Sequence, residues 1–242
     1  NADWQICPKS RIPPWDVVCP CCRTAAENPA LARCVREVMR LDRAADTAWD
    51  GVRTEAEVAA LRARLRKFFL GAIGGLPART PLNAKVTGVV RREGYRIEKV
   101  LFEPEPGHYA TGHLFVPDGV TAARKAPGLL VPCGHSMSGK QSQIYQRISV
   151  LAAKGGIVAF VYDPIDQGER WQGAKGTACN PCGGHIAVGM RAHLIGWSQA
   201  RFRIWDGIRA LDYLASRPEV RADRLGVCGQ SGGGTLSSYL FA

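Results

Sequence analysis

Residues 223–235 read DRLGVCGQSGGGT, and this short stretch decides how the fold is interpreted. The apolar run at 225–228 is typical of a buried strand, and a helix-like pattern begins at 236–240. Between them, glycines surround Ser231. A glycine-rich turn between a strand and a helix can bind a phosphate, bend the chain without a chemical role, or present a nucleophile. The spacing of the glycines separates these alternatives.

The spacing fits neither nucleotide-binding signature. A phosphate loop requires Lys and then Ser or Thr after its last glycine, and no Lys follows here. No register of residues 226–234 fits G-x-G-x-x-G with an acidic residue about 20 positions later. Gly229, Ser231 and Gly233 do match G-x-S-x-G, the spacing of a nucleophile elbow. The alternative is a structural turn whose serine has no chemical role.

The elbow spacing has a steric cause. A sharp reversal from strand to helix places the serine in a strained backbone conformation. Side chains two residues before and two residues after the serine would collide, which explains glycine at 229 and 233. The N-terminus of the following helix favours developing negative charge. We therefore expect Ser231 to be a nucleophile held above the edge of the sheet.

A serine nucleophile also needs two hydrogen-bond donors for the oxyanion that forms on its substrate. One donor is expected from the residue after the nucleophile, here the Gly232 N–H, and the other from the loop after an earlier strand. The strand-like run 128–132 is followed by Cys-Gly-His-Ser. We therefore predict the backbone N–H of His135 as the second donor, with Ser136 as the substitute. The His135 imidazole is not used as a base in this interpretation, and its alternative role is to pack or to line the pocket.

The remaining pattern predicts an α/β protein with antiparallel opening strands and a mostly parallel sheet covered by helices on both faces. The expected strands lie at 86–90, 95–102, 109–116, 128–132, 157–162 and 225–228. The expected helices lie around 144–151, 204–215 and 236–240. A long loop rich in Gly, Pro and Cys is expected from the end of the 157–162 strand to about residue 196.

The N-terminal part differs in character from the rest. Residues 1–30 are rich in Pro and Cys, and a helical period begins near Pro29. Thr54 and Glu57 have the spacing of a helix-capping box. We expect a Cys/Pro-rich and helical segment at 1–80 and an α/β core at 81–242.

Composition excludes some classes of partner and leaves others open. The net charge of +11 comes from scattered basic residues, without a basic stripe interleaved with aromatics, so no nucleic-acid partner is predicted. No apolar run is long enough to span a membrane. The chain begins with Asn, which fits either no signal peptide or one already removed, so localisation and oligomeric state stay open.

The nine cysteines allow several interpretations. Cys133 and Cys228 fall in apolar runs and are expected to be small buried side chains. Cys179 and Cys182 form a C-x-x-C that could be a disulfide, a redox pair or half of a zinc site. His185, or the cysteines at 19, 21 and 22, could complete such a site only if the fold brings them close. No metal or other cofactor is predicted as part of the main interpretation.

Three stretches together resemble a known superfamily. VPCGHSMSGK at 131–140, VYDPIDQGER at 161–170 and the 203–235 segment ending in GVCGQSGGGT resemble the α/β-hydrolases. Within it they look most like acetylxylan esterases and cephalosporin-C deacetylases, relatives of the dienelactone hydrolases. The resemblance implies a serine esterase that forms an acyl-enzyme on Ser231, holds the oxyanion with the Gly232 and His135 amides, and acts on a short acyl ester, often of a carbohydrate. A serine peptidase, a non-catalytic module of the same fold, and a redox or zinc protein are the alternatives.

The sequence departs from the superfamily pattern after Ser231. The triad of this fold runs Ser, acid, His along the chain, yet all five histidines precede Ser231 and no Asp or Glu follows it. We therefore expect the acid and the histidine beyond residue 242, a sheet incomplete at its C-terminal edge, and little esterase activity from residues 1–242 alone. Asp163 and Asp166 are further candidate carboxylates, although Asp163 is expected to orient its own loop. Arg203 and Asp206 are expected to form a surface or packing pair.

Overall fold

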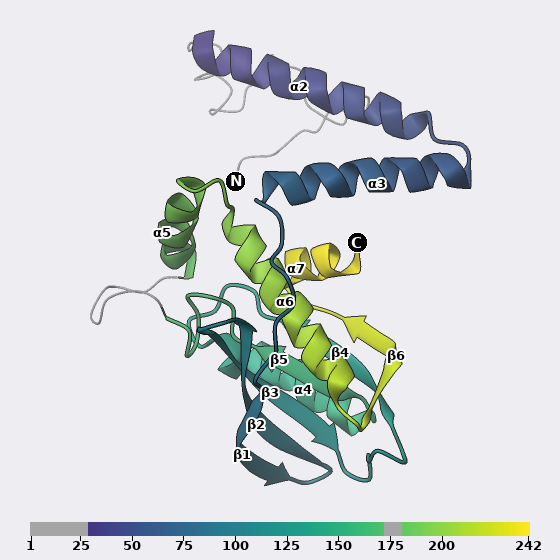
Figure 1. Ribbon diagram of the computed structural model, residues 1–242, viewed down its shortest axis with the longest axis vertical. Helices are drawn as coiled ribbons and strands as arrows, with labels where there is room; N and C mark the ends of the chain where they lie inside the picture. The colour runs from purple at the N-terminus through teal and green to yellow at the C-terminus, as the bar shows by residue number, and fades with distance from the viewer. Residues whose placement is uncertain (1–28, 172–180) are drawn as a thin grey trace, which may run out of the picture. The chain divides into compact units, whose positions relative to one another are not determined.

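The structure, a computed structural model, describes residues 29–171 and 181–242 (Figure 1). It divides into two compact units, one ending at Leu65 and the other running from Arg66 to Ala242. In the part of the chain that is described, no helix is long and apolar enough to cross a membrane.

The described part of the first unit is helical. Helix α2 spans Pro29–Asp50, and α3 spans Glu55–Ala72, with the boundary between the units falling inside α3. The Glu57 N–H donates to Thr54 Oγ1 at 3.3 Å, and the Thr54 N–H donates to Glu57 Oε2 at 2.9 Å. This reciprocal pair is the capping box that the sequence predicts, and it explains why α3 begins where it does.

The second unit is built on a six-stranded sheet in the order β1-β2-β3-β5-β4-β6. The strands are β1 (Lys85–Arg92), β2 (Tyr95–Glu105), β3 (His108–Pro117), β4 (Ala126–Pro132), β5 (Val158–Tyr162) and β6 (Val220–Val227). Strands β1, β2, β3 and β5 pair antiparallel, whereas β5, β4 and β6 pair parallel. The expected α/β fold with antiparallel opening strands is therefore confirmed.

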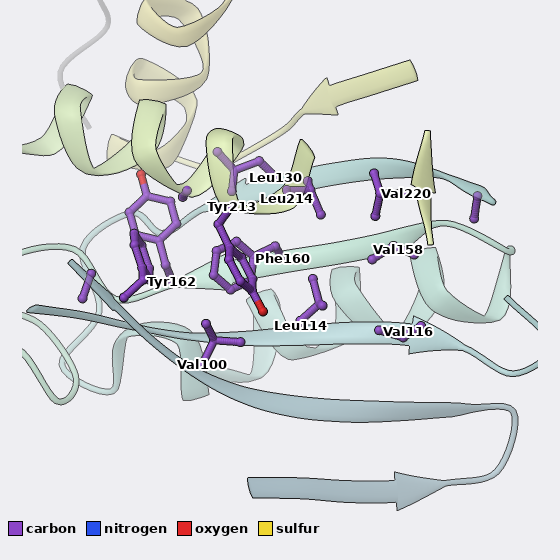
Figure 2. Close-up of a cluster of buried hydrophobic side chains, with 14 residues drawn as sticks. Val100, Leu114, Val116, Leu130, Val158, Phe160, Tyr162, Tyr213, Leu214 and Val220 are labelled. Carbon is purple, nitrogen blue, oxygen red and sulfur yellow. The ribbon is translucent and has the colours of Figure 1, made fainter. Parts of the chain in front are cut away.

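Two helices cover opposite faces of this sheet (Figure 1). Alternate residues of a strand point to opposite faces. Phe160 of β5 therefore packs with Leu214 of α6 (Gln199–Ser216), while Val161 packs in the cluster that contains Tyr145 of α4 (Gln143–Lys154). Figure 2 shows the core on the α6 side, where Tyr162, Phe160, Tyr213 and Leu130 lie between helix and sheet. Both faces of the central strands are buried, which explains their continuous apolar runs.

Three further helical segments belong to this unit. The 3₁₀ turn η1 (Gly139–Gln141) precedes α4, and α7 (Gly232–Phe241) follows the serine turn. Helix α5 (Pro181–His193) lies inside the stretch that we expect to be a long loop, so that expectation is wrong for these residues. Gly183, Gly184 and Gly189 lie within α5, and because glycine is a poor helix former the sequence suggests a loop here.

Three connections begin at the carboxyl ends of the parallel strands. Because β4, β5 and β6 run in the same direction, the residues after each strand emerge at the same end. These connections begin at Cys133, Asp163 and Cys228. Ligands of open α/β sheets bind at this end, and it is where the predicted serine lies.

Candidate active site

The serine turn has the strained backbone that the sequence predicts. Ser231 has φ 56° and ψ −124°, a conformation that non-glycine residues rarely adopt. It lies between the end of β6 and the first residue of α7. Ser231 is exposed to solvent. The hydroxyl is therefore presented to solvent at the carboxyl end of the parallel strands, although its chemical role stays a prediction.

The flanking glycines are required by close contacts between backbone segments. A Cβ atom on Gly229 would lie 2.4 Å from the Gly233 carbonyl oxygen. A Cβ atom on Gly233 would lie 2.2 Å from the Pro132 carbonyl oxygen. Both distances are shorter than real side chains allow, and both neighbours are backbone that cannot rotate away. The serine turn therefore packs against itself and against the end of β4.

The loop after β4 lies against this turn. Gly134 is buried, and a Cβ atom on it would lie 2.4 Å from the Gln230 carbonyl oxygen and 3.3 Å from the Gly232 nitrogen. Gly232 is the first residue of α7, so its N–H has no acceptor within the helix. Among residues 29–171 and 181–242, neither the Gly232 nor the His135 N–H has a hydrogen-bond partner. The two amides that the sequence names as oxyanion donors are thus both unoccupied and come from adjoining segments.

The His135 imidazole meets a second histidine. Its Nε2 lies 3.0 Å from Nδ1 of His185 on α5. Burial, with the nearby Arg203 charge, lowers the pKa of His135, and burial, Arg203 and His135 lower the pKa of His185 to about 4. Both rings are thereby favoured in their neutral form. One of the residues considered for a zinc site thus reaches the predicted active site.

The zinc alternative is not decided by this contact. No group of three or more His, Cys, Asp or Glu residues is arranged to bind a metal ion in the described ranges. Cys179 and the cysteines at 7, 19, 21 and 22 lie outside those ranges, as does the side chain of Cys182. Cys133 is fully buried with a free thiol, as expected, whereas Cys228 is only half-buried.

The loop after β5 is held by charge. The Asp163 carboxylate is fully buried and accepts hydrogen bonds from the Lys140 N–H at 2.7 Å, the Thr111 hydroxyl at 2.8 Å and the Glu169 N–H at 3.2 Å. The Lys140 ammonium, 1% exposed, also pairs with Asp163 and with the partly exposed Glu169. Asp163 therefore ties its own loop to η1, in line with the expectation that it orients the loop.

A second buried ion pair fixes the end of the same loop. Arg170 donates to the Asp206 carboxylate of α6 at 2.5 Å and to the Tyr109 carbonyl oxygen at 2.8 Å. Asp206 is fully buried, which would raise its pKa, but Arg170 and His108 outweigh burial and hold the pKa below the usual range. Arg203, one turn earlier on α6, is also buried and donates to Gln167 at 2.8 Å. The expectation that Arg203 and Asp206 form a surface or packing pair is therefore wrong: each holds a different residue of the β5 loop.

A pocket of about 330 Å³ lies beside this charged loop and not at the serine turn. Thr87, Thr111, His113, Lys140 and Glu169 are among its lining residues. Burial and the Lys140 charge lower the pKa of His113 to about 4, and nearby carboxylates only partly oppose this. None of the predicted site residues lines it.

The proton acceptor for Ser231 is not found among the described residues. Ser231 Oγ makes no hydrogen bond within residues 29–171 and 181–242. The histidines of this part of the chain have other partners or face solvent: His108 lies by Arg170, His113 by Gln146, His135 by His185, and His193 is exposed. The geometry thus contains a serine and two free amides, without a base bonded to the serine.

Comparison with known proteins identifies the fold. No protein-family model matches the chain, and no curated protein sequence matches it. Among solved structures, a Bacteroides fragilis protein proposed to be an acetyl xylan esterase matches with a TM-score of 0.61 and 21% identity, over 77% of this chain and 50% of that protein. The acetyl xylan esterase from Paenibacillus sp. R4 matches with a TM-score of 0.53 and 25% identity, over 66% of this chain and 50% of that protein.

A third match extends the range of esterases. The glucuronoyl esterase from Solibacter usitatus has a TM-score of 0.51 and 16% identity, over 78% of this chain and 56% of that protein. The chain thus spans about half the length of each of these three structures. This chain has the α/β-hydrolase fold, and its structural relatives include acetyl xylan esterases.

Proposed function

We propose that the protein is a serine ester hydrolase in which Ser231 is the nucleophile. The observation that carries the proposal is the backbone of Ser231, whose φ of 56° and ψ of −124° are maintained by two obligatory glycines. Strain of this kind costs about 1–3 kcal/mol and persists where function requires it. An idle serine would gain nothing from that cost, because a glycine at this position would remove it.

In the proposed reaction, Ser231 Oγ attacks the ester carbonyl carbon while its proton passes to a base. The carbonyl oxygen becomes an oxyanion, which the Gly232 and His135 N–H groups stabilise. Collapse of the tetrahedral intermediate breaks the bond to the alcohol, which leaves with the proton from the base. Water then attacks the acyl-enzyme by the same route and releases the acid.

The base and its acid partner are proposed to come from outside residues 1–242. In α/β-hydrolase sites both follow the nucleophile in the chain, and every histidine of this sequence precedes Ser231. The matched part of this chain covers 50% of each of the first two solved structures, which leaves room for both groups in a longer protein.

The proposed substrate is a short acyl ester of a carbohydrate. Two of the similar structures are named for acetyl xylan, an acetyl ester of a carbohydrate. A third is named for glucuronoyl esters, in which the sugar supplies the acyl group, so the short acyl group rests on the first two.

The test is hydrolysis of an aryl acetate and of acetylated xylan by the full-length protein and by residues 1–242. We expect Ser231→Ala to abolish the activity of the full-length protein and residues 1–242 to be much slower than it. Ser238→Ala is the matched control, because Ser238 lies on α7 and only back-bonds to the Gly234 carbonyl at 3.2 Å. Equal activity of Ser231→Ala and Ser238→Ala would refute the proposal.

A further inference from the structure

The two peptide groups that flank Gly134 are each held by a buried side chain. The Gly134 N–H donates to the Tyr145 hydroxyl at 2.6 Å, and the Gly134 carbonyl oxygen accepts from the Gln167 side-chain amide at 2.7 Å. Both partners are buried, with Tyr145 3% and Gln167 1% exposed. Neither hydrogen bond competes with water, so the loop after β4 has little freedom at this point.

The bond from Gln167 also fixes the direction of the next amide. The described chain contains no cis peptide bond, so the Gly134–His135 peptide is trans and planar. In such a peptide the carbonyl of Gly134 and the N–H of His135 point in opposite directions. Gln167 therefore determines where the His135 N–H points, and that N–H has no partner among the residues described.

The orientation of the Gln167 amide is itself determined. Arg203 Nη2 donates to Gln167 Oε1 at 2.8 Å, and a guanidinium can only donate. The carbonyl of Gly134 can only accept, so the NH₂ of Gln167 must face it. Because an Arg lies on one side and a carbonyl on the other, the amide has a single satisfied orientation. Burial lowers the pKa of Arg203, but a guanidinium remains charged in proteins.

We propose that Gln167, oriented by Arg203, is a positioning residue that aims the His135 N–H at the oxyanion of the ester substrate. This inference rests on the proposed function of Ser231 and assigns a role to two residues that the mechanism above does not use. Neither residue touches the substrate. Their effect is to keep one donor aligned, so that no reorganisation is needed when the oxyanion forms.

The chain provides a matched control for the test. Gln146 also donates its side-chain amide to a backbone carbonyl at 2.7 Å, but that carbonyl belongs to Lys140 in η1 and not to Gly134 beside the serine turn. Gln167→Glu and Gln146→Glu each replace the amide by a carboxylate of the same shape, which cannot donate when ionised. Arg203→Lys keeps the positive charge and loses the planar fork that orients Gln167.

The experiment measures kcat and KM for aryl acetate hydrolysis by the full-length protein, with melting temperatures as a folding check. We expect Gln167→Glu to lower kcat about 10-fold to 100-fold and to change KM less than about 2-fold, because a misplaced donor weakens only the transition state. Arg203→Lys is expected to lower kcat less, and Gln146→Glu to leave it unchanged. A kcat of Gln167→Glu equal to that of Gln146→Glu, in folded proteins, would overturn the inference.

A second measurement separates this inference from the proposed function. Hydrogen–deuterium exchange of the segment 133–136 needs no catalysis, and we expect it to be faster in Gln167→Glu than in Gln146→Glu. If the unaltered protein hydrolyses no ester, the proposed function is wrong. The exchange rates still test whether the hydrogen bond from Gln167 to the Gly134 carbonyl holds the loop. Unchanged exchange together with unchanged kcat would show that Gln167 does not hold this loop.

Discussion

Two connections at the same end of the sheet are held in opposite ways. The turn after β6 is held by backbone contacts, since Gly229 and Gly233 leave no space for a Cβ atom. The loop after β5 is held by side-chain charge, with Asp163 bonded to Lys140 and Arg170 bonded to Asp206. The first arrangement combines a contact between sequence neighbours, Gly229 and Gly233, with a contact to the end of β4, whereas the second joins side chains 23 and 36 positions apart.

The difference explains what each connection can do. A turn made of crowded backbone has one conformation and can hold a strained serine at a fixed position. A loop held by buried ion pairs depends on every partner, because removing one leaves an uncompensated charge. Substitutions in the two connections should therefore fail for different reasons and by different amounts.

The largest effect is expected in the charged loop. Asp163→Asn removes the charge opposite the buried Lys140 ammonium, and breaking such a pair costs about 3–5 kcal/mol of unfolding free energy. Denaturation by urea measures it. Asp223→Asn is the control, since its partner Arg221 and Asp223 itself are exposed, and little change is expected. A similar stability of the two variants would show that charge does not hold the loop.

A smaller loss is expected in the serine turn. Gly233→Ala places a Cβ atom 2.2 Å from the Pro132 carbonyl oxygen and should cost about 2–3 kcal/mol by overpacking. Gly226→Ala makes the same change inside β6, one residue before the strand ends, where the nearest atom to a Cβ would be Leu129 Cδ1 at 3.5 Å. We expect Gly226→Ala to change stability little in the same urea titration. Equal losses would mean that backbone contact is not the constraint.

Removing the strain itself should stabilise the protein. Ser231→Gly relieves a positive φ that costs about 1–3 kcal/mol, partly offset by about 0.5–1 kcal/mol of backbone entropy that glycine loses on folding. A net gain of about 1 kcal/mol is expected, together with loss of hydrolysis. Ser237→Gly, within α7, should instead destabilise the protein. A destabilised Ser231→Gly protein would contradict the account of the strained turn.

One further effect concerns pH and involves both connections. The pKa of His185, beside the serine turn, and that of His113, beside the charged loop, fall from 6.5 to about 4, mainly through burial. Between these values the unfolded chain binds more protons than the folded one, so stability falls as the pH falls from 6.5 to 4. We expect the melting temperature of a His113→Gln, His185→Gln protein to fall less over this range than that of the unaltered protein. The exposed His193→Gln should behave like the unaltered protein, and an identical pH response of all three would refute the role of burial.

The same contrast explains what could be predicted from the sequence. The serine turn could be predicted because the residues that indicate it are close together in the sequence. Gly229, Ser231 and Gly233 suffice to indicate the strained φ that the structure has. The strands could likewise be predicted from apolar runs, because each run is a short continuous stretch of the sequence. The roles of these residues in catalysis stay predictions, because no substrate contact tests them.

The ion pairs of the charged loop could not be predicted, because the paired residues lie far apart in the sequence. Nothing near Asp206 indicates that it pairs with Arg170, and nothing near Gln167 indicates that it joins Arg203 to the Gly134 carbonyl. For the two pairings, the missing information is a contact between distant residues. Helix α5 was missed for a local reason, because Gly183, Gly184 and Gly189 lie within it and glycine is a poor helix former.

Helix α6 supplies the side chains that hold both loops of the site. Arg203 and Asp206 lie one turn apart on it, the first reaching the loop after β4 through Gln167 and the second reaching the end of the loop after β5 through Arg170. A one-residue insertion between them would rotate one side chain by about 100° relative to the other. Exposed residues of α6 can therefore be substituted, whereas an insertion or deletion between Arg203 and Asp206 would break one of the two contacts.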